Sequence, residues 1–115
     1  MIFAVETEER SLHVFPDADT AASYCEGLAA EAAIWMFWDD TGAPMVPHFD
    51  IPNKRGLFTN KNGLYHLVPV ASGHHALLHD VLAHIRHVVG EFPLTSVRAV
   101  QEYLNRPAAG LSAPA

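Results

Sequence analysis

The strongest hydrophobic signal in the chain is an unbroken apolar run at residues 34–38, which ends at the polar turn sequence of residues 39–42. Large and branched apolar residues followed by a turn signal are typical of a buried strand rather than of a helix. Successive side chains on a strand point to opposite faces, and both faces of this segment are apolar. We therefore expect a central strand that is covered on both sides.

Shorter strands are predicted on either side of this run. They lie at residues 2–5, 12–15, 45–50, 57–59 and 64–70. Residues 45–50 form at best an edge strand, because the connection that contains them is rich in proline, which has no N–H for the strand ladder. Asn62 and Gly63 supply the positive φ of a tight turn, so the last two segments predict a β-hairpin.

Apolar residues at helical spacing predict three helices. They span residues 17–26, 73–90 and 95–105. Asp17 can cap the first helix, and we expect Tyr24 to anchor that helix to the sheet. The second has a broad apolar stripe that ends at Gly90, a plausible C-cap, and Thr95 can cap the third.

The order of these elements predicts the fold class. Strands cluster through hairpins instead of alternating with helices, which is typical of an α+β protein. We expect residues 1–106 to form one domain with a mainly antiparallel sheet of about four to six strands, and about two or three helices packed on one face. Residues 107–115 are small, rich in proline and alanine, and predicted to be a flexible tail.

Charge is distributed unevenly along the 115 residues, which carry a formal net charge of −6. Residues 1–40 contain nine Asp and Glu residues against Arg10 alone, a net charge of −8. An acidic surface repels nucleic acid and anionic membranes and attracts a basic partner, although it can also serve solubility alone. The small basic area at Lys54, Arg55 and Lys61 has no interleaved aromatic platform, so no nucleic-acid site is predicted.

The cellular setting follows from cysteine usage and hydropathy. Cys25 is the single cysteine, so the chain forms no internal disulfide, and we expect it to be a small buried residue. Glu6 interrupts the apolar start, so no signal peptide is predicted. Because no apolar run approaches membrane-spanning length, we expect a cytoplasmic protein with no membrane partner.

Catalytic motifs are missing from the sequence. It contains no G-x-S-x-G, P-loop, G-x-G-x-x-G or C-x-x-C pattern, so we predict no enzyme and no cofactor. His48 and Asp50 share a face of an extended segment and could act as an acid–base pair or half a metal site, but no third member is evident. Asp39 and Asp40 are adjacent, so turn chemistry explains them better than a carboxylate pair does.

A group of histidines lies on the predicted helix of residues 73–90. They are His74, His75, His79, His84 and His87. The first flank of the helix holds His75 and His79, and the opposite flank holds His84 and His87, so the side chains do not converge. A His-x-x-x-His spacing without further ligands is a weak metal signal, and we predict no metal site.

Four short motifs within residues 1–70 carry a resemblance to a known family. They are Met1-Ile2-Phe3, Ala21-x-x-Tyr24-Cys25-Glu26-Gly27, Trp35-x-Phe37-Trp38-Asp39-Asp40-x-Gly42-x-Pro44, and Pro52-Asn53-Lys54-x-Gly56 followed by Gly63-x-Tyr65-x-Leu67. In these motifs the chain resembles small bacterial immunity proteins of contact-dependent growth inhibition systems. The resemblance implies a cytoplasmic protein that binds and neutralises one cognate toxin domain, often a nuclease.

An acidic inhibitor could occupy the basic surface with which a nuclease holds phosphates. The predicted toxin-binding residues lie at the end of the central strand and in the proline-rich connection. They are Trp38, Asp39, Asp40, His48 and Asp50. Glu6, Glu8 and Glu9 form an alternative acidic patch.

Two other functions stay open at this stage. The first is a metal-dependent enzyme or metal sensor that uses the His-rich helix at residues 74–87. The second is a structural homo-oligomeric adaptor that buries an uncovered face of the sheet.

Overall fold

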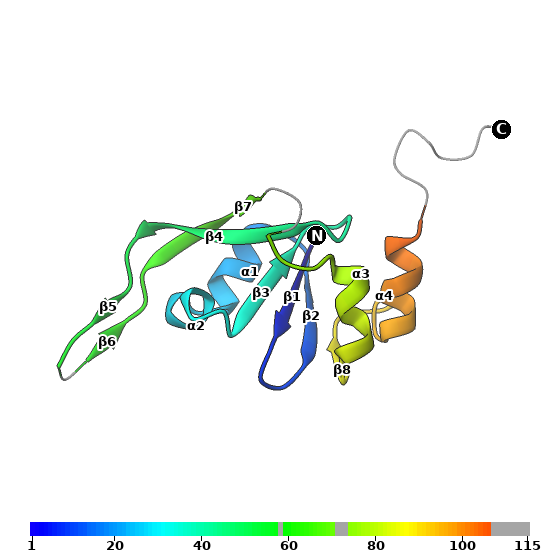
Figure 1. Ribbon diagram of the computed structural model, residues 1–115, viewed down its shortest axis with the longest axis horizontal. Coiled ribbons are helices and arrows are strands. Elements are labelled where there is room, and N and C mark those ends of the chain that lie inside the picture. Colours follow the sequence, from blue (N-terminus) through cyan, green and yellow to red (C-terminus); the bar gives the residue numbers. More distant parts are fainter. Residues whose placement is uncertain (58, 71–73, 107–115) are drawn as a thin grey trace.

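The computed structural model describes residues 1–57, 59–70 and 74–106, and its centre is a mixed six-stranded sheet (Figure 1). The strand order is β7-β4-β3-β1-β2-β8. The sheet strands are β1 (Ile2–Glu6), β2 (Ser11–Phe15), β3 (Trp35–Trp38), β4 (Pro44–Ile51), β7 (Leu64–Pro69) and β8 (His87–Val89). Only the β2–β8 pair is parallel among the described pairs, so the predicted α+β fold with a mainly antiparallel sheet is confirmed. The predicted tail at residues 107–115 lies outside the described residues.

The apolar run is the central strand β3, as predicted. It pairs with β1 on one side and with β4 on the other. Trp38 lies opposite Phe3, and Phe37 lies opposite Ala4, so these pairs alternate between the two faces of the sheet. Both Phe37 and Trp38 are fully buried.

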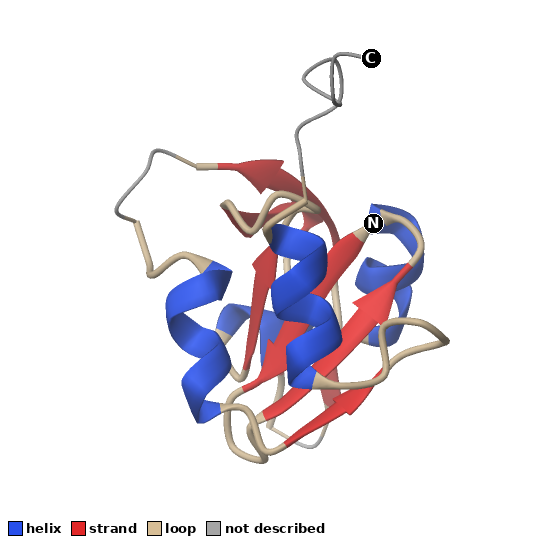
Figure 2. Ribbon diagram, turned by 90° about the vertical axis from the view of Figure 1, so that its right-hand side faces the viewer, coloured by secondary structure: helices blue, strands red, loops and turns tan. Residues whose placement is uncertain are grey.

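Helices cover both faces of the sheet, which corrects the prediction of packing on one face (Figure 2). The described helices are α1 (Ala18–Tyr24), α2 (Gly27–Glu31), α3 (Leu78–Val81), the 3₁₀ helix η1 (Leu82–His84) and α4 (Val97–Leu104). None of them is long and apolar enough to cross a membrane. The physical reason for two helical layers lies in β1 and β3, whose side chains are apolar on both faces and therefore need two covers.

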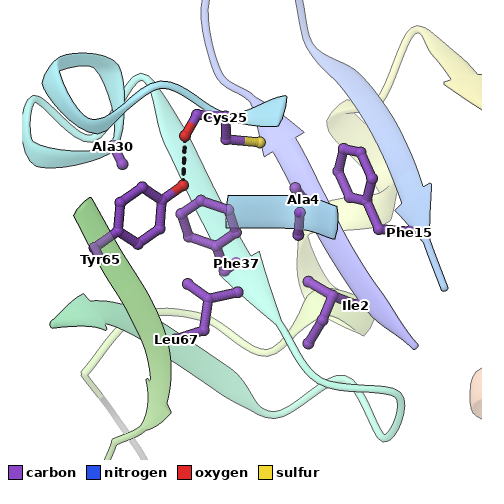
Figure 3. Packing of buried hydrophobic residues seen from close by; sticks show 9 residues of the cluster. Ile2, Ala4, Phe15, Cys25, Ala30, Phe37, Tyr65 and Leu67 are labelled. Carbon is purple, nitrogen blue, oxygen red and sulfur yellow. Dashed lines mark hydrogen bonds between the residues drawn. The ribbon is translucent and has the colours of Figure 1, made fainter. Parts of the chain in front are cut away.

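Each face has its own hydrophobic core. The core under α1 and α2 is shown in Figure 3 and contains Ile2, Ala4, Phe15, Ala21, Cys25, Ala30, Phe37, Tyr65 and Leu67. The core under α3, η1 and α4 contains Phe3, Val5, Leu12, Trp38, Leu78, Leu82, Leu94 and Val100. In the first core the Tyr65 hydroxyl donates a hydrogen bond to the backbone carbonyl of Cys25, which ties β7 to the end of α1.

The long helix predicted at residues 73–90 is wrong for the part of it that the structure describes. Helical turns extend only from Leu78 to His84, and β8 then pairs with β2, with Val88 opposite Leu12. Part of the apolar stripe nevertheless faces the core, since Leu78 and Leu82 are buried, whereas Leu77 and Val89 are half-exposed. Branched side chains such as Val88 and Val89 favour a strand, and pairing with β2 outweighs the helical pattern.

The predicted hairpin around Asn62 and Gly63 is also wrong. β7 pairs with β4, and a separate two-stranded arm forms from β5 (Lys54–Arg55) and β6 (Asn60–Lys61). The arm projects away from the sheet (Figure 1). Gly63 is needed for close approach rather than for a turn, because a Cβ there would lie 1.9 Å from the carbonyl oxygen of Ile51.

The remaining local predictions are partly confirmed. The Asp17 carboxylate caps α1 by accepting a hydrogen bond from the N–H of Thr20 at 2.7 Å. Ser96, not Thr95, caps α4. β4 is not an edge strand, because it pairs with β3 at its first residues and with β7 along its length.

Candidate protein-binding surface

Trp38, the apolar member of the predicted toxin-binding set, lies in the core. It is 1% exposed, and its indole N–H donates to the carbonyl oxygen of Ala76 at 2.8 Å. The ring also contacts His75 edge to face, with 5.2 Å between ring centroids. Trp38 therefore has a structural role and presents no surface to a partner.

Asp39 and Asp40 are engaged within the chain. One carboxylate oxygen of Asp39 accepts hydrogen bonds from the N–H and hydroxyl of Thr41 and from the N–H of Ala43, at 2.6–3.0 Å. Asp40 pairs with the guanidinium of Arg106 at 3.3 Å. Turn chemistry thus accounts for Asp39, and an ion pair that is partly exposed accounts for Asp40.

We expect Asp39→Ala to lower the free energy of unfolding by about 1–2 kcal/mol, because it removes the carboxylate oxygen that accepts three hydrogen bonds in the turn. Asp40→Ala is expected to cost less than about 1 kcal/mol, since it breaks only an exposed ion pair. Urea denaturation of both variants measures the difference. Equal losses would contradict the structural role assigned to Asp39.

His48 and Asp50 lie on one exposed face of β4, as predicted, but far from Asp39. Asp50 lies seven positions after Ala43, which is hydrogen-bonded to Asp39, and seven positions span about 23 Å along a strand. The structure adds a partner that sequence analysis missed, because β7 places His66 opposite His48. The Asp50 carboxylate lies 2.8 Å from Nδ1 of His66, and the two imidazole centroids are 5.2 Å apart.

No metal centre forms in the described part of the chain. Its histidine, cysteine and acidic side chains do not gather into any group of three or more that could hold a metal ion. The described histidines of residues 74–87 are spread over a loop, α3, η1 and β8 instead of one helix. The single His-rich helix that suggested a metal-dependent function is therefore not formed by the described residues.

Nucleophile candidates are also poorly placed. Burial raises the pKa of the Cys25 thiol to about 12, so the thiolate is scarce at neutral pH. The Ser11 hydroxyl lies 3.0 Å from Nε2 of His13, but Ser11 is 4% exposed. Neither group can readily reach a substrate from its position.

An aromatic cluster marks a different surface, on the α1 side of the sheet. The ring centroids of Trp35 lie 4.9 Å from His13 and 5.9 Å from Tyr24, and Tyr24 lies 5.4 Å from Phe15. The small side chain of Ala4 on the intervening strand β1 leaves room for these rings to meet. Tyr24 is 58% exposed, so it does not anchor α1 in the core as predicted, and it contributes an aromatic side chain to the surface.

Acidic side chains border this cluster at the β1–β2 turn. Glu6 lies opposite Trp35 in the strand register, and its carboxylate accepts hydrogen bonds from the N–H groups of Glu8 and Glu9 at 3.0 and 2.9 Å. Thr7 fixes the turn to the start of β3 through a 2.8 Å hydrogen bond to the carbonyl of Ile34. Glu8 and Glu9 are exposed in this turn, which is bonded to the chain next to Trp35.

We name Tyr24, Trp35, His13, Glu6, Glu8 and Glu9 the aromatic–acidic surface. Sequence analysis identified its acidic residues, Glu6, Glu8 and Glu9, as an alternative patch for toxin binding. It gave no sign of the aromatic half, because Tyr24 and Trp35 become neighbours only when α1 packs across the sheet.

Burial lowers the pKa of His13, with a further lowering from His87 and an opposing effect of Glu6. Burial likewise lowers the pKa of His75. The unfolded chain, with an ordinary histidine pKa of 6.5, then binds more protons in mild acid than the folded chain does. The neutral side chains of His13 and His75 therefore contribute to stability above the unfolded-state pKa of 6.5. This contribution is lost as the pH falls below 6.5 toward the lowered pKa values of the folded chain.

We expect the free energy of unfolding to fall between about pH 7.5 and about pH 5.5. The variant His13→Phe keeps an aromatic ring but cannot titrate, so its free energy of unfolding should decrease less over this pH range. His75 should account for part of the decrease that this variant still shows. Denaturant unfolding at the two pH values measures this. A stability that rises on acidification would contradict the assignment.

Comparison of the chain with family models, curated proteins and solved structures found no match.

Proposed function

We propose that this chain is an immunity protein that binds and neutralises a cognate toxin domain in the bacterial cytoplasm, and that the toxin is a nuclease, because an acidic surface suits a basic phosphate-binding partner. The observation that carries the proposal is the aromatic–acidic surface, where exposed Tyr24 contacts partly exposed Trp35, and Trp35 lies opposite Glu6 at the start of the turn that holds Glu8 and Glu9. Aromatic side chains are enriched among the residues that dominate binding energy at protein interfaces. The resemblance of residues 1–70 to immunity proteins supports the same function.

The two halves of the surface have different roles in this proposal. The carboxylates steer a basic toxin surface toward the chain and thereby raise the association rate. Tyr24 and Trp35 then supply apolar contact area that lowers the dissociation rate. Occupation of a phosphate-binding surface by carboxylates would exclude the nucleic-acid substrate of the toxin.

This assignment moves the proposed contact away from the set predicted by sequence. Trp38 is excluded by burial, and Asp39 and Asp40 are occupied within the chain. His48 and Asp50 remain exposed but lie on the ribbon formed by β4 and β7, apart from the aromatic–acidic surface.

We expect Tyr24→Ala to weaken binding of the toxin domain by about 2 kcal/mol, or roughly thirtyfold in Kd. The free energy of unfolding should stay within about 0.5 kcal/mol of the wild-type value. The matched control is Phe92→Ala, because Phe92 is an aromatic residue that is 91% exposed and lies in the loop after β8. The partner is the candidate toxin domain encoded immediately upstream, and binding is measured by calorimetry together with protection of cells that express the toxin. Equal effects of the two variants would contradict the proposed surface.

A further inference from the structure

β3 and β4 diverge beyond their paired residues (Figure 1), and a cleft lies between them. They pair only at Trp38 with Pro44 and at Phe37 with Met45, although β4 continues to Ile51. Beyond Met45 lies an open space of about 300 Å³, which is lined by both strands, by the end of α2 and by His74 and His75. The sheet is therefore open between two of its strands.

Pro47 explains why the pairing stops. The Asp39 N–H donates to the carbonyl of Ala43, which marks this pair as a hydrogen-bonding position of the ladder, although the Ala43 N–H donates to the Asp39 carboxylate instead. In an antiparallel ladder every second pair is a hydrogen-bonding position. The next such pairs are Phe37 with Met45 and then Trp35 with Pro47. Proline has no N–H to donate to the Trp35 carbonyl, and the ladder ends there.

Both sides of the cleft therefore present strand edges. By the same alternation, the backbone N–H and carbonyl of Trp35 point toward β4, and those of Phe49 point toward β3. The side chains around the cleft are largely apolar and include Ala30, Ala33, Met36, Met45, Val46 and Phe49. Glu31 adds a carboxylate, which forms an ion pair with exposed Arg55 at 3.4 Å. Such an exposed ion pair is weak.

We infer that this cleft receives an extended peptide segment of the partner, which adds as a strand beside β3. The segment alternates apolar side chains, which face the lining, with a basic side chain, which replaces Arg55 beside Glu31. Main-chain hydrogen bonds to Trp35 supply affinity, and the lining supplies specificity, as in other cases of strand addition. The inference rests on the proposed function for the identity of the partner, since the segment belongs to the toxin domain.

The cleft and the aromatic–acidic surface are continuous. Trp35 contributes its ring to the surface and its backbone to the cleft. A toxin domain steered by Glu8 and Glu9 would therefore arrive beside the cleft.

A short synthetic peptide of alternating valine and lysine tests the cleft directly. Added to the full chain labelled with ¹⁵N, it should shift the amide resonances of Trp35, Met36 and Phe49 and slow hydrogen exchange at Trp35. Pro47→Val restores an N–H opposite Trp35, closes the ladder and should weaken peptide binding at least about tenfold. The matched control is Pro69→Val, because Pro69 lies on the edge strand β7, outside the cleft.

The outcomes separate this inference from the proposed function. Slowed exchange at Trp35 with both the peptide and the toxin domain supports the cleft. Binding of the toxin domain without protection at Trp35 overturns the cleft and leaves the proposed function intact. No shifts with the peptide, self-association of the chain through the cleft, or equal binding by Pro47→Val and wild type also overturns it, whether or not the toxin domain binds.

Discussion

Exchanging Glu8 and Glu9 together for lysine is expected to slow association with the toxin domain by about tenfold or more at low ionic strength. Both side chains are exposed, and only their backbone N–H groups bond to Glu6, so the substitution leaves the turn in place. The change reverses the field next to Tyr24 and Trp35, where a basic partner would arrive. Stopped-flow kinetics at about 0.02 M and about 0.15 M ionic strength measures the effect, which should shrink with salt.

The matched control for this charge reversal is Glu91→Lys with Glu102→Lys. It changes net charge by the same amount but acts at the loop after β8 and on α4. If steering depends on the aromatic–acidic surface, the control retains most of the wild-type rate. Equal slowing by the two double variants would show that net charge, not this surface, governs association.

Trp38→Ala is expected to reduce the free energy of unfolding by about 3–5 kcal/mol. The substitution leaves a cavity in the core under α3 and α4 and removes the donor to the Ala76 carbonyl. The free energy of unfolding of small domains is only about 5–15 kcal/mol, so a large share of the variant molecules would be unfolded in cells. Protection against the toxin should then fall in proportion to the amount of folded protein.

Comparing stability with binding distinguishes the core residue Trp38 from the proposed binding residue Tyr24. Tyr24→Ala should weaken binding with little change in stability, whereas Trp38→Ala should weaken stability first. Trp38→Phe keeps a large ring in the core and should lose less than Trp38→Ala does. A stable Trp38→Ala protein that binds poorly would return Trp38 to the interface and contradict its burial.

The central strand could be predicted because its sequence signal is local and strong. Residues 34–38 are apolar on both faces, and the structure buries both faces. The Asp17 cap and strand β1 are likewise encoded by neighbouring residues. The same reasoning could have predicted helices on both faces, since a strand with two apolar faces needs two covers.

Other elements depend on contacts between distant residues. Val88 is apolar at a position that fits a helix or a strand, and only the partner Leu12 decides between them. Asn62 and Gly63 look like a turn, yet Asn62 accepts a hydrogen bond from the N–H of Leu28, and Gly63 approaches the backbone of Ile51. Such choices are made by tertiary packing, which local propensity cannot report.

The candidate site shows the same division. Glu6, Glu8 and Glu9 were visible as an acidic patch, but the aromatic rings beside them come from β2, α1 and β3. Asp39 was visible as a turn residue, and that interpretation is confirmed by its hydrogen bonds. The pairing of Asp50 with His66 required the β4–β7 register, which the predicted hairpin did not contain.

The most direct test of the account is calorimetric titration of the full chain with the candidate toxin domain encoded immediately upstream, at low and at physiological salt. We expect tight one-to-one binding that weakens as salt is added, because carboxylates of the aromatic–acidic surface face a basic partner. Tight binding that is insensitive to salt would retain the immunity function but contradict the electrostatic role of this surface. The absence of binding to a toxin domain shown to be folded would contradict the proposed function itself.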